Sequence, residues 1–500
     1  MSHSRGGASP EGQAGVAAAG PERRRVPAMQ DATAAGLGAA GLHAGAEPAS
    51  GRPDGPSLRD RAVRGGLWTA GGFGLGVLIR LGSNVLLAQL LLAEDFGLMG
   101  LVAIALIGLE MFSDLGIGPA LVQSERTDRR FRDTAWTLQA ARGFALWGAA
   151  AAAAWPLSVA LDAPELAQVL PVAGASAAFS GLQSTNWFSV MRELSLRGRV
   201  LIELSTAGVV AGVMVGWAYG FDASVWALVA GTLAAAGFRT ALSHTLPGGW
   251  NRPCLDPVAA RQLLGFGGWL FLSTVLTFLA LNLDKLLLKA FTGLTTFGVF
   301  YVGYSLALLG TQLAERVGSQ VGFPALSAVH RERPAGFPRA FTRARLAVMA
   351  PIGACMLGLV ALGPSLFHGL YPVRFWPAGW VVQVLGFSVL GSLVSLTYGW
   401  AAVARGDTAL KFRLVAAQLG AGLPCVLGGW ALGGDTGFVL GLGVAHLARY
   451  PLDAWLLRRC GLWQPRVDLA FFTLGTLGTL AAVAAAGVLT PAAAALGAAP

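Results

Sequence analysis

Three polar side chains interrupt a long apolar run in the middle of the sequence. Residues 263–293 are mostly apolar, but Asn282, Asp284 and Lys285 lie in their last third. About 20 apolar residues cross the hydrocarbon core of a bilayer, and an ionised side chain there costs at least about 2.5 kcal/mol. Such a group is retained where it has a partner, reaches the membrane interface, or acts on something that crosses.

Helical spacing separates these residues into two sets. Asn282, Lys285 and Lys289 lie three and four positions apart on one face, whereas Asp284 lies roughly 100° away. Lys289 is close enough to the end of the run to reach the interface. Asp284 has no basic residue three or four positions away. We therefore expect it either to pair with a basic residue on another helix, as an outer gate, or to take part in ion coupling.

Charged residues also occur inside other apolar runs. Arg80 lies deep in residues 66–92 with no acidic residue three or four positions away, so it either lines a cavity or pairs with a distant carboxylate. Glu315 and Arg316 are neighbours in residues 296–322, and adjacent helical side chains point about 100° apart. At least one of them therefore faces a central lumen, or the two pair with another helix.

Two further arginines have ordinary alternatives to a cavity position. Arg449 precedes Asp453 by four residues, which is the spacing of a local ion pair on a helix. Arg142 lies near the predicted inner end of its helix, where a long side chain can reach the interface. Both residues stay candidates for lining a cavity.

The composition indicates a polytopic membrane protein. The chain has 500 residues, of which 54% are hydrophobic and 12% charged, about half the charged share of ordinary soluble domains. The net charge of +10 is not accompanied by a basic helix or an aromatic-basic platform, so we expect no nucleic-acid partner. The four cysteines form no CxxC pair and have no histidine at ligand spacing, so we expect neither disulfides, nor zinc, nor another cofactor.

The apolar runs predict an all-α fold with about thirteen membrane spans. The predicted spans are residues 66–92, 96–122, 134–160, 166–190, 200–220, 224–246, 263–290, 296–322, 346–367, 379–403, 414–432, 436–457 and 469–490. Arginine gathers in every second break between them, and the alternate breaks hold Lys289 and Arg374. Because positively charged loops stay in the cytoplasm, we predict a cytoplasmic N-terminus, with residues 1–60 as a disordered cytoplasmic tail.

The two halves of the chain repeat short motifs. Phe96-Gly97 begins the second predicted span and Phe297-Gly298 the eighth, 201 residues later. We therefore predict an N-terminal six-helix bundle over residues 61–250, a C-terminal six-helix bundle over 251–460, and an additional C-terminal helix and tail over 461–500. Parallel repeats around a site at the middle of the membrane are typical of transporters, and chance similarity between apolar segments is the alternative.

Several ordered motifs resemble one family. The chain contains AEDFGLMGLVAIALIGLEMFSDLGIGPALVQSE, VMRELSLRGRVLIEL, LDKLLLKAFTGLTTFGVFYVGYSLALL, FPALSAV and LYPVRFWPAGWVVQVLG, in this order. Together they resemble bacterial polysaccharide flippases of the Wzx type, in the multidrug/oligosaccharidyl-lipid/polysaccharide exporter superfamily. The resemblance covers roughly Gly65 to Arg459. Gln89 departs from it, because many members of the family carry an arginine at this position.

The resemblance implies two six-helix bundles around a cationic central cavity in the bacterial cytoplasmic membrane. It also implies that an undecaprenyl-pyrophosphate-linked oligosaccharide moves to the outer leaflet, supplied and used by glycosyltransferases and a polymerase of one pathway. A diphosphate in a medium of low dielectric needs compensating charge, and guanidinium can bind phosphate at two points. The expected substrate-binding residues are Arg80, Arg316, Arg449 and Arg142. The expected gating or ion-coupling residues are Asp284, Lys285, Asn282 and Glu315.

Two other functions stay open. A multidrug or small-molecule antiporter of the same superfamily would favour acidic cavity residues over Arg80. A membrane enzyme of glycan assembly would need catalytic groups on sizeable outer loops, whereas breaks such as Leu161–Glu165 and Gly433–Asp435 are short.

Overall fold

The computed structural model describes residues 58–113, 117, 121, 128–187, 196–246, 249–264 and 270–486, and the described part is built from helices. In the first half these are α1 (Leu58–Leu90), α2 (Ala93–Phe112), α4 (Arg129–Ala160), α5 (Leu166–Gly181), α7 (Leu196–Gly220), α8 (Val225–His244) and the short α9 (Pro257–Leu264). In the second half they are α10 (Leu270–Phe291), α11 (Leu294–Ala307), α12 (Leu309–Val317), α13 (Phe323–Glu332), α14 (Phe337–Leu370), α15 (Pro377–Ala404), α16 (Thr408–Arg459) and α17 (Pro465–Ala486).

Ten of the described helices are long and apolar enough to cross a membrane, which confirms the predicted all-α membrane fold. α5 is apolar but has only 16 residues. Two predicted spans fall within α16, whose backbone leaves helical geometry at Gly433 and Gly434. Gly434 has a φ of 56°, a conformation that glycine adopts without steric cost, so the predicted break here is present as a kink. The predicted N-terminal tail up to residue 57 lies outside the described residues.

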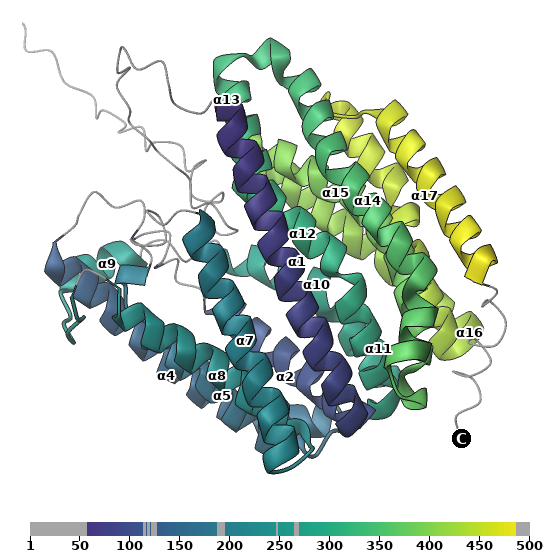
Figure 1. Cartoon of the computed structure of the whole chain (residues 1–500). Coiled ribbons are helices and arrows are strands. Elements are labelled where there is room, and N and C mark those ends of the chain that lie inside the picture. Colours follow the sequence, from purple (N-terminus) through teal and green to yellow (C-terminus); the bar gives the residue numbers. More distant parts are fainter. Residues whose placement is uncertain are drawn as a thin grey trace, which may run out of the picture.

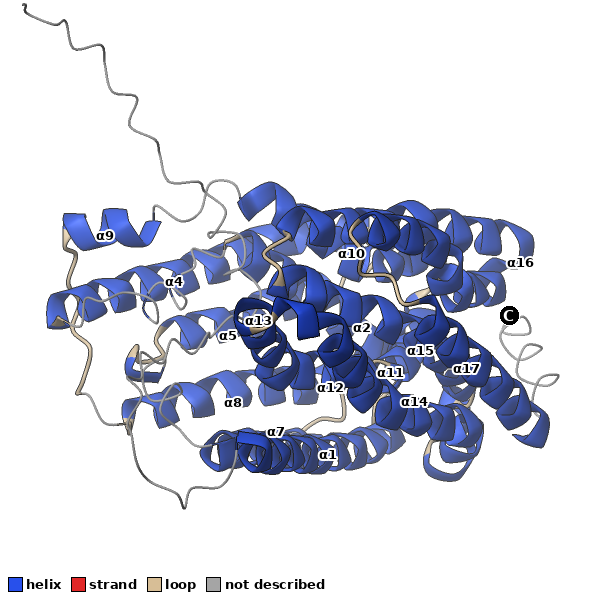
Figure 2. Ribbon diagram, turned by 90° about the horizontal axis from the view of Figure 1, so that it is seen from above, coloured by secondary structure: helices blue, strands red, loops and turns tan. Residues whose placement is uncertain are grey.

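Helices of the first half pack mainly on one another, as do those of the second half. α1 packs on α7, α7 on α8, and α5 on both α8 and α4; in the second half α15 contacts α11, α14, α16 and α17. Figure 1 shows α1 running between α7 on one side and α12 on the other. Seen from above in Figure 2, α2 and α11 lie between the two groups of helices.

The crossing of α2 and α11 is the largest contact between the two halves. Phe96 and Phe297 are buried here, and the glycine that follows each of them allows the two backbones to touch. Glu94 accepts a hydrogen bond of 2.7 Å from the hydroxyl of Thr295, its counterpart 201 residues later. Residues that correspond in the predicted repeat therefore meet face to face. We call the end at which α2 and α11 begin the closed end; from there the ribbons diverge toward α9 and α13 (Figure 1).

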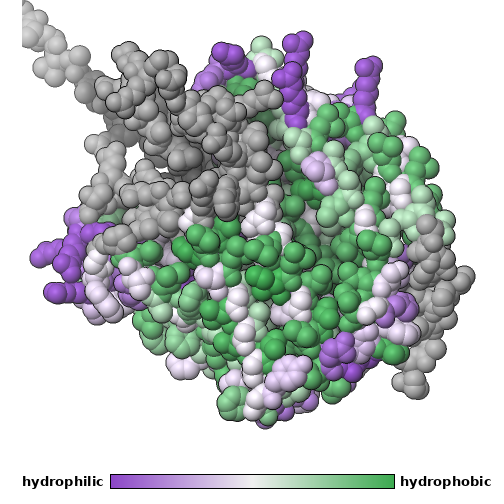
Figure 3. Space-filling view, viewed as in Figure 1, coloured by the Kyte–Doolittle hydropathy of each residue, from purple (hydrophilic) through white to green (hydrophobic). Residues whose placement is uncertain are grey.

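The surface is apolar over the middle of the molecule. Figure 3 shows hydrophobic side chains across α1 and its neighbours, with polar side chains gathered near α13 and near α9. Large apolar side chains that point outward include Leu78, Leu362 and Leu469, each more than 60% exposed. A soluble protein rarely exposes such an area, so this surface fits a lipid bilayer as its partner.

A buried ion pair fixes α17 to the second half. The guanidinium of Arg345 on α14 lies 2.5 Å from a carboxylate oxygen of Asp468 on α17, and neither side chain is exposed. Tyr398 on α15 and Tyr450 on α16 both donate hydrogen bonds to the other carboxylate oxygen. Four helices thus meet at Asp468. The predicted spans 296–322 and 346–367 leave Arg345 in the break between them; this is wrong, because α14 begins eight residues before Arg345 and turns its side chain into the core.

Candidate functional site

Two of the predicted arginines come together where α1, α7 and α12 meet. Arg316 on α12 forms an ion pair of 2.5 Å with Glu203 on α7, and both side chains are partly exposed, at 39% and 49%. The guanidinium of Arg316 also lies 5.3 Å from the ring centroid of Phe73 on α1. Arg80 is exposed and lies two turns further along α1, the helix that packs against both α7 and α12. We call Arg80, Glu203 and Arg316 the charged cluster.

The charged cluster has an excess of positive charge. It contains two guanidinium groups and one carboxylate, and Arg80 has no ion-pair partner of its own among the residues that the structure describes. Guanidinium groups bind phosphate and carboxylate through two parallel hydrogen bonds and stay ionised. The cluster can therefore receive a further anion.

The backbone next to Arg316 is irregular. A single π-helical turn, Gly318–Gly322, separates α12 from α13. The indole ring of Trp400 packs against Gly318 so closely that a side chain at this position would overlap the ring. π-helical turns inside α-helices occur frequently at functional sites. Sequence periodicity gave no sign of this turn.

Glu315 is not part of the charged cluster. It is exposed and forms no ion pair among the described residues, whereas its neighbour Arg316 pairs with Glu203.

The predicted polar face of α10, formed by Asn282, Lys285 and Lys289 and called the stripe below, is buried. Asn282, Lys285 and Lys289 are only 4%, 5% and 4% exposed. Lys289 was expected to reach the interface, and this is wrong because α10 packs against α2, α11 and α16, with the stripe inside. Asp284, off the stripe, has 22% of its side chain exposed.

Lys285, in the middle of this stripe, makes polar contacts with α11 and with its own helix. Its ammonium donates a hydrogen bond of 2.9 Å to the hydroxyl of Tyr304 on α11, and another to the carbonyl of Leu281. The ammonium also lies 3.6 Å from a carboxylate oxygen of Asp284. Asp284 therefore has its nearest cation on its own helix, one residue away. The amide of Asn282 donates to the carbonyl of Phe278.

The other two predicted arginines lie outside the charged cluster. Arg142 donates to the carbonyls of Ser113 and Glu110, at 2.8 and 2.9 Å, and so caps the end of α2. This satisfies carbonyl groups that a helix end leaves without a partner. Arg449 is 4% exposed and forms the local ion pair with Asp453, with an N–O distance of 3.1 Å. Ser395 of α15 donates to the same carboxylate.

Arg374 carries a contact that the sequence did not predict. It lies in a short 3₁₀ turn, Val373–Phe375, and donates to the carbonyls of Ala88 and Leu91 at 2.7 and 2.9 Å. A second-half cation thereby caps the C-terminal end of α1 at the closed end. Gln89 adds a hydrogen bond of 2.9 Å to the carbonyl of Leu370. The sequence held one signal for Arg374, because it is one of two basic residues in the predicted outer breaks.

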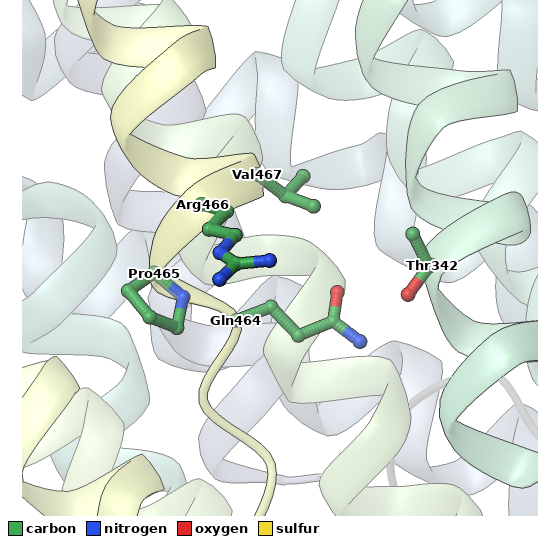
Figure 4. A pocket seen from close by; sticks show the side chains of 5 residues that line it. All are labelled: Thr342, Gln464, Pro465, Arg466 and Val467. Atoms are coloured by element: carbon green, nitrogen blue, oxygen red, sulfur yellow. The ribbon is translucent and has the colours of Figure 1, made fainter.

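A small pocket lies beside the first residues of α17. Its volume is about 260 Å³, and Figure 4 shows Gln464, in the loop just before α17, directed toward Thr342 on α14, with Arg466 of α17 beside it. Gln464 accepts a hydrogen bond from Arg345, so the pocket adjoins the buried ion pair with Asp468 and not the charged cluster. The described residues contain no group of three or more His, Cys, Asp or Glu side chains that could hold a metal ion.

Comparison with known proteins agrees with this architecture. The lipopolysaccharide biosynthesis protein WzxC of Escherichia coli (strain K12) is 22% identical over 281 residues, 55% of this chain and 56% of WzxC. The chain thus matches little more than half the length of this relative. A lipid II flippase, MurJ, in an inward closed conformation, has a TM-score of 0.61 at 13% identity, over 84% of this chain and 92% of MurJ.

A multidrug resistance transporter of the MATE family, in an inward-facing conformation, has a TM-score of 0.60 at 14% identity, over 77% of this chain and 94% of the transporter. These two likenesses show a shared fold. The model of a family described as polysaccharide biosynthesis protein matches residues 86–361, more than half of the chain, which therefore belongs to that family.

Proposed function

We propose that this protein moves an undecaprenyl-pyrophosphate-linked oligosaccharide across the bacterial cytoplasmic membrane by alternating access. The observation that carries the proposal is the ion pair of Arg316 with Glu203 between the two halves of the chain, beside the helix α1 that carries Phe73 and Arg80. A diphosphate that enters the membrane needs about this much compensating charge, because each uncompensated charge in a medium of low dielectric is costly.

The membership in a polysaccharide biosynthesis family supports this function over drug export. A multidrug antiporter of the same superfamily shares the fold, but the charged cluster attracts anions, not the cations that many drugs are. Glycosyltransferases and a polymerase of the same pathway would make the substrate and use it.

The orientation of the chain forms part of the proposal. The arginine-rich breaks face the cytoplasm, together with the N-terminus, and the closed end faces outward. Residues 61–250 and 251–460 act as two bundles that rock around the charged cluster. The contacts of Arg374 and of Glu94 with Thr295 then hold the outer side shut, so this conformation receives substrate from the cytoplasm. The stripe on α10, near the α2–α11 crossing, is the proposed gating or ion-coupling element.

Flipping of a defined substrate tests the function. The purified protein is reconstituted in liposomes that carry a fluorescent polyprenyl-diphosphate-linked sugar, and a membrane-impermeant quencher reports its leaflet. We expect the protein to speed the exchange between leaflets and the variant Arg80→Ala to abolish this effect at equal insertion. Equal rates of exchange between leaflets in liposomes with and without the protein would contradict the proposal.

A further inference from the structure

We infer that Glu203 is a built-in counter-ion that the diphosphate of the substrate displaces from Arg316, so that binding itself breaks the ion pair between α7 and α12. The inference rests on the proposed function. It assigns a role to a residue that no pattern in the sequence singled out.

The position of Glu203 suits a replaceable partner. Its ion pair with Arg316 joins residues 113 positions apart in sequence and connects a first-half helix to a second-half helix. Both side chains are partly exposed, in contrast to the fully buried pair of Arg345 and Asp468. A ligand can reach the first pair, whereas the second is closed to it.

Arg316 stays in position when Glu203 leaves. One face of its guanidinium lies over the ring of Phe73, at 5.3 Å from the centroid, while its nitrogen Nη1 donates a hydrogen bond to the carboxylate of Glu203. Cation–π contact with α1 does not use the N–H groups that bind oxyanions. The N–H groups of the Arg316 guanidinium therefore remain oriented to bind a phosphate once the carboxylate has moved.

Charge favours the exchange. Glu203 supplies one negative charge to a site with two guanidinium groups, and Arg80 has no ion-pair partner of its own among the described residues. A diphosphate supplies at least two negative charges and enough oxygens to engage both arginines. A ligand with a single negative charge does not compensate both arginines and has no such advantage over the carboxylate.

The exchange links loading to movement. In the empty protein Glu203 compensates Arg316 inside the membrane region and ties α7 to α12. When the diphosphate takes its place, the direct tie between α7 and α12 is lost, and the diphosphate joins α1 to α12 through Arg80 and Arg316 instead, while the contacts at the closed end remain. Loading thus frees α7 to move relative to α12.

Ligand affinity is the first test. Binding of geranyl diphosphate, a soluble polyprenyl diphosphate, is measured with the full chain in nanodiscs. We expect Glu203→Gln to bind it about three- to tenfold more tightly than wild type, because the competing charge is removed. Glu332→Gln on α13, an exposed carboxylate outside the cluster, serves as the matched control and should bind like wild type. Equal affinity of Glu203→Gln and wild type would overturn the inference.

The movement of α7 relative to α12 is the second test. Spin labels at Ser205→Cys on α7 and at Ser319→Cys in the π-helical turn directly after α12, both exposed, report the distance between these two positions in a chain without its four native cysteines. Geranyl diphosphate should lengthen this distance, and Glu203→Gln should lengthen it without ligand. A distance that stays constant as the ligand binds would overturn the inference.

Failure of the proposed function and failure of the inference about Glu203 give different results. If Arg80→Ala and Arg316→Gln both bind geranyl diphosphate as wild type does, the proposed function fails and the inference with it. If both variants lose binding while Glu203→Gln shows neither tighter binding nor a longer distance, the proposed function stands and only the role of Glu203 is refuted.

Discussion

Gly97 and Gly298 lie against each other's backbone where α2 crosses α11. A side chain on Gly97 would come within 2.7 Å of the carbonyl oxygen of Leu294, and one on Gly298 would overlap the carbonyl of Ala93. The two contacts are equivalent, because Gly298 follows Gly97 by 201 positions and Leu294 follows Ala93 by the same 201 positions. Each half of the chain therefore supplies a glycine at the equivalent position of one crossing, and small residues let membrane helices approach this closely.

Gly298→Ala should open this crossing. The added methyl group cannot fit against Ala93, and such overpacking costs about 1–3 kcal/mol. We expect a cysteine placed at Val299, which is buried at the crossing, to become reactive toward a membrane-impermeant maleimide added from outside. Gly212→Ala on α7, where the methyl group meets nothing within 4 Å, is the control and should leave the labelling unchanged. Normal protection of Val299→Cys in the Gly298→Ala background would argue against a closed crossing.

Arg374→Gln should weaken the closed end from the opposite side. The glutamine loses the charge that caps the carbonyls of Ala88 and Leu91, and a cation at a helix C-terminus contributes about 0.3–1 kcal/mol. We expect the midpoint of thermal unfolding to fall by a few degrees. Arg374→Lys keeps the charge and should recover most of the loss. If Arg374→Gln and Arg374→Lys melt alike, the cap has no energetic role.

Hydropathy predicted the all-α membrane fold well, because the length of apolar runs follows from the thickness of the bilayer. Long apolar runs give helices, and the break at Gly433–Asp435 appears as a kink at Gly434. Local spacing also predicted the pair of Arg449 with Asp453 and the shared face of Asn282 with Lys285. Contacts within one helix are readable from sequence because helical geometry fixes them.

The contacts between helices could not be predicted from the sequence. Glu203 meets Arg316 across 113 residues, and Asp468 meets Arg345 across 123. No periodicity encodes such distances, since they depend on how whole helices pack. Arg142 shows the same limit, because its role as a cap depends on where α2 ends beside α4.

Arg80→Ala and Arg316→Ala should each abolish surface-polymer production in cells that depend on this protein. Each removes one of the two guanidinium groups available to the diphosphate. Arg80→Lys should retain part of the function, because lysine keeps the positive charge although it lacks the two parallel N–H donors of guanidinium. Arg239→Ala, which removes an arginine of α8, is the control for expression and insertion. Normal polymer output from Arg80→Ala would contradict the assignment of the site.

Lys285→Met should impair the protein through Asp284. The substitution leaves that carboxylate without its cation at 3.6 Å, and one partner lost from a buried pair costs about 3–5 kcal/mol, less here because Asp284 is partly exposed. The double variant Asp284→Asn with Lys285→Met removes both charges and should recover stability. Transport by the double variant then decides whether the charges act in gating: recovered stability without transport supports gating, and recovery of both refutes it.

Asp468→Asn should be among the most destabilising single substitutions in the second half. Asp468 accepts hydrogen bonds from Arg345, Tyr398 and Tyr450, and its loss leaves a fully buried guanidinium without a counter-charge, at a cost of about 3–5 kcal/mol. The detergent-solubilised protein should unfold at a clearly lower temperature. Asp435→Asn, whose carboxylate has no ion pair among the described residues, is the control.

A paired substitution separates charge from packing at the same place. Arg345→Met with Asp468→Leu removes both charges and keeps most of the volume, and buried ion pairs replaced in this way are often neutral for stability. We expect the double variant to unfold at a higher temperature than Asp468→Asn, although Tyr398 and Tyr450 lose an acceptor. If it is no more stable than Asp468→Asn, the hydrogen-bond network holds α17 in place, and not the compensation of Arg345.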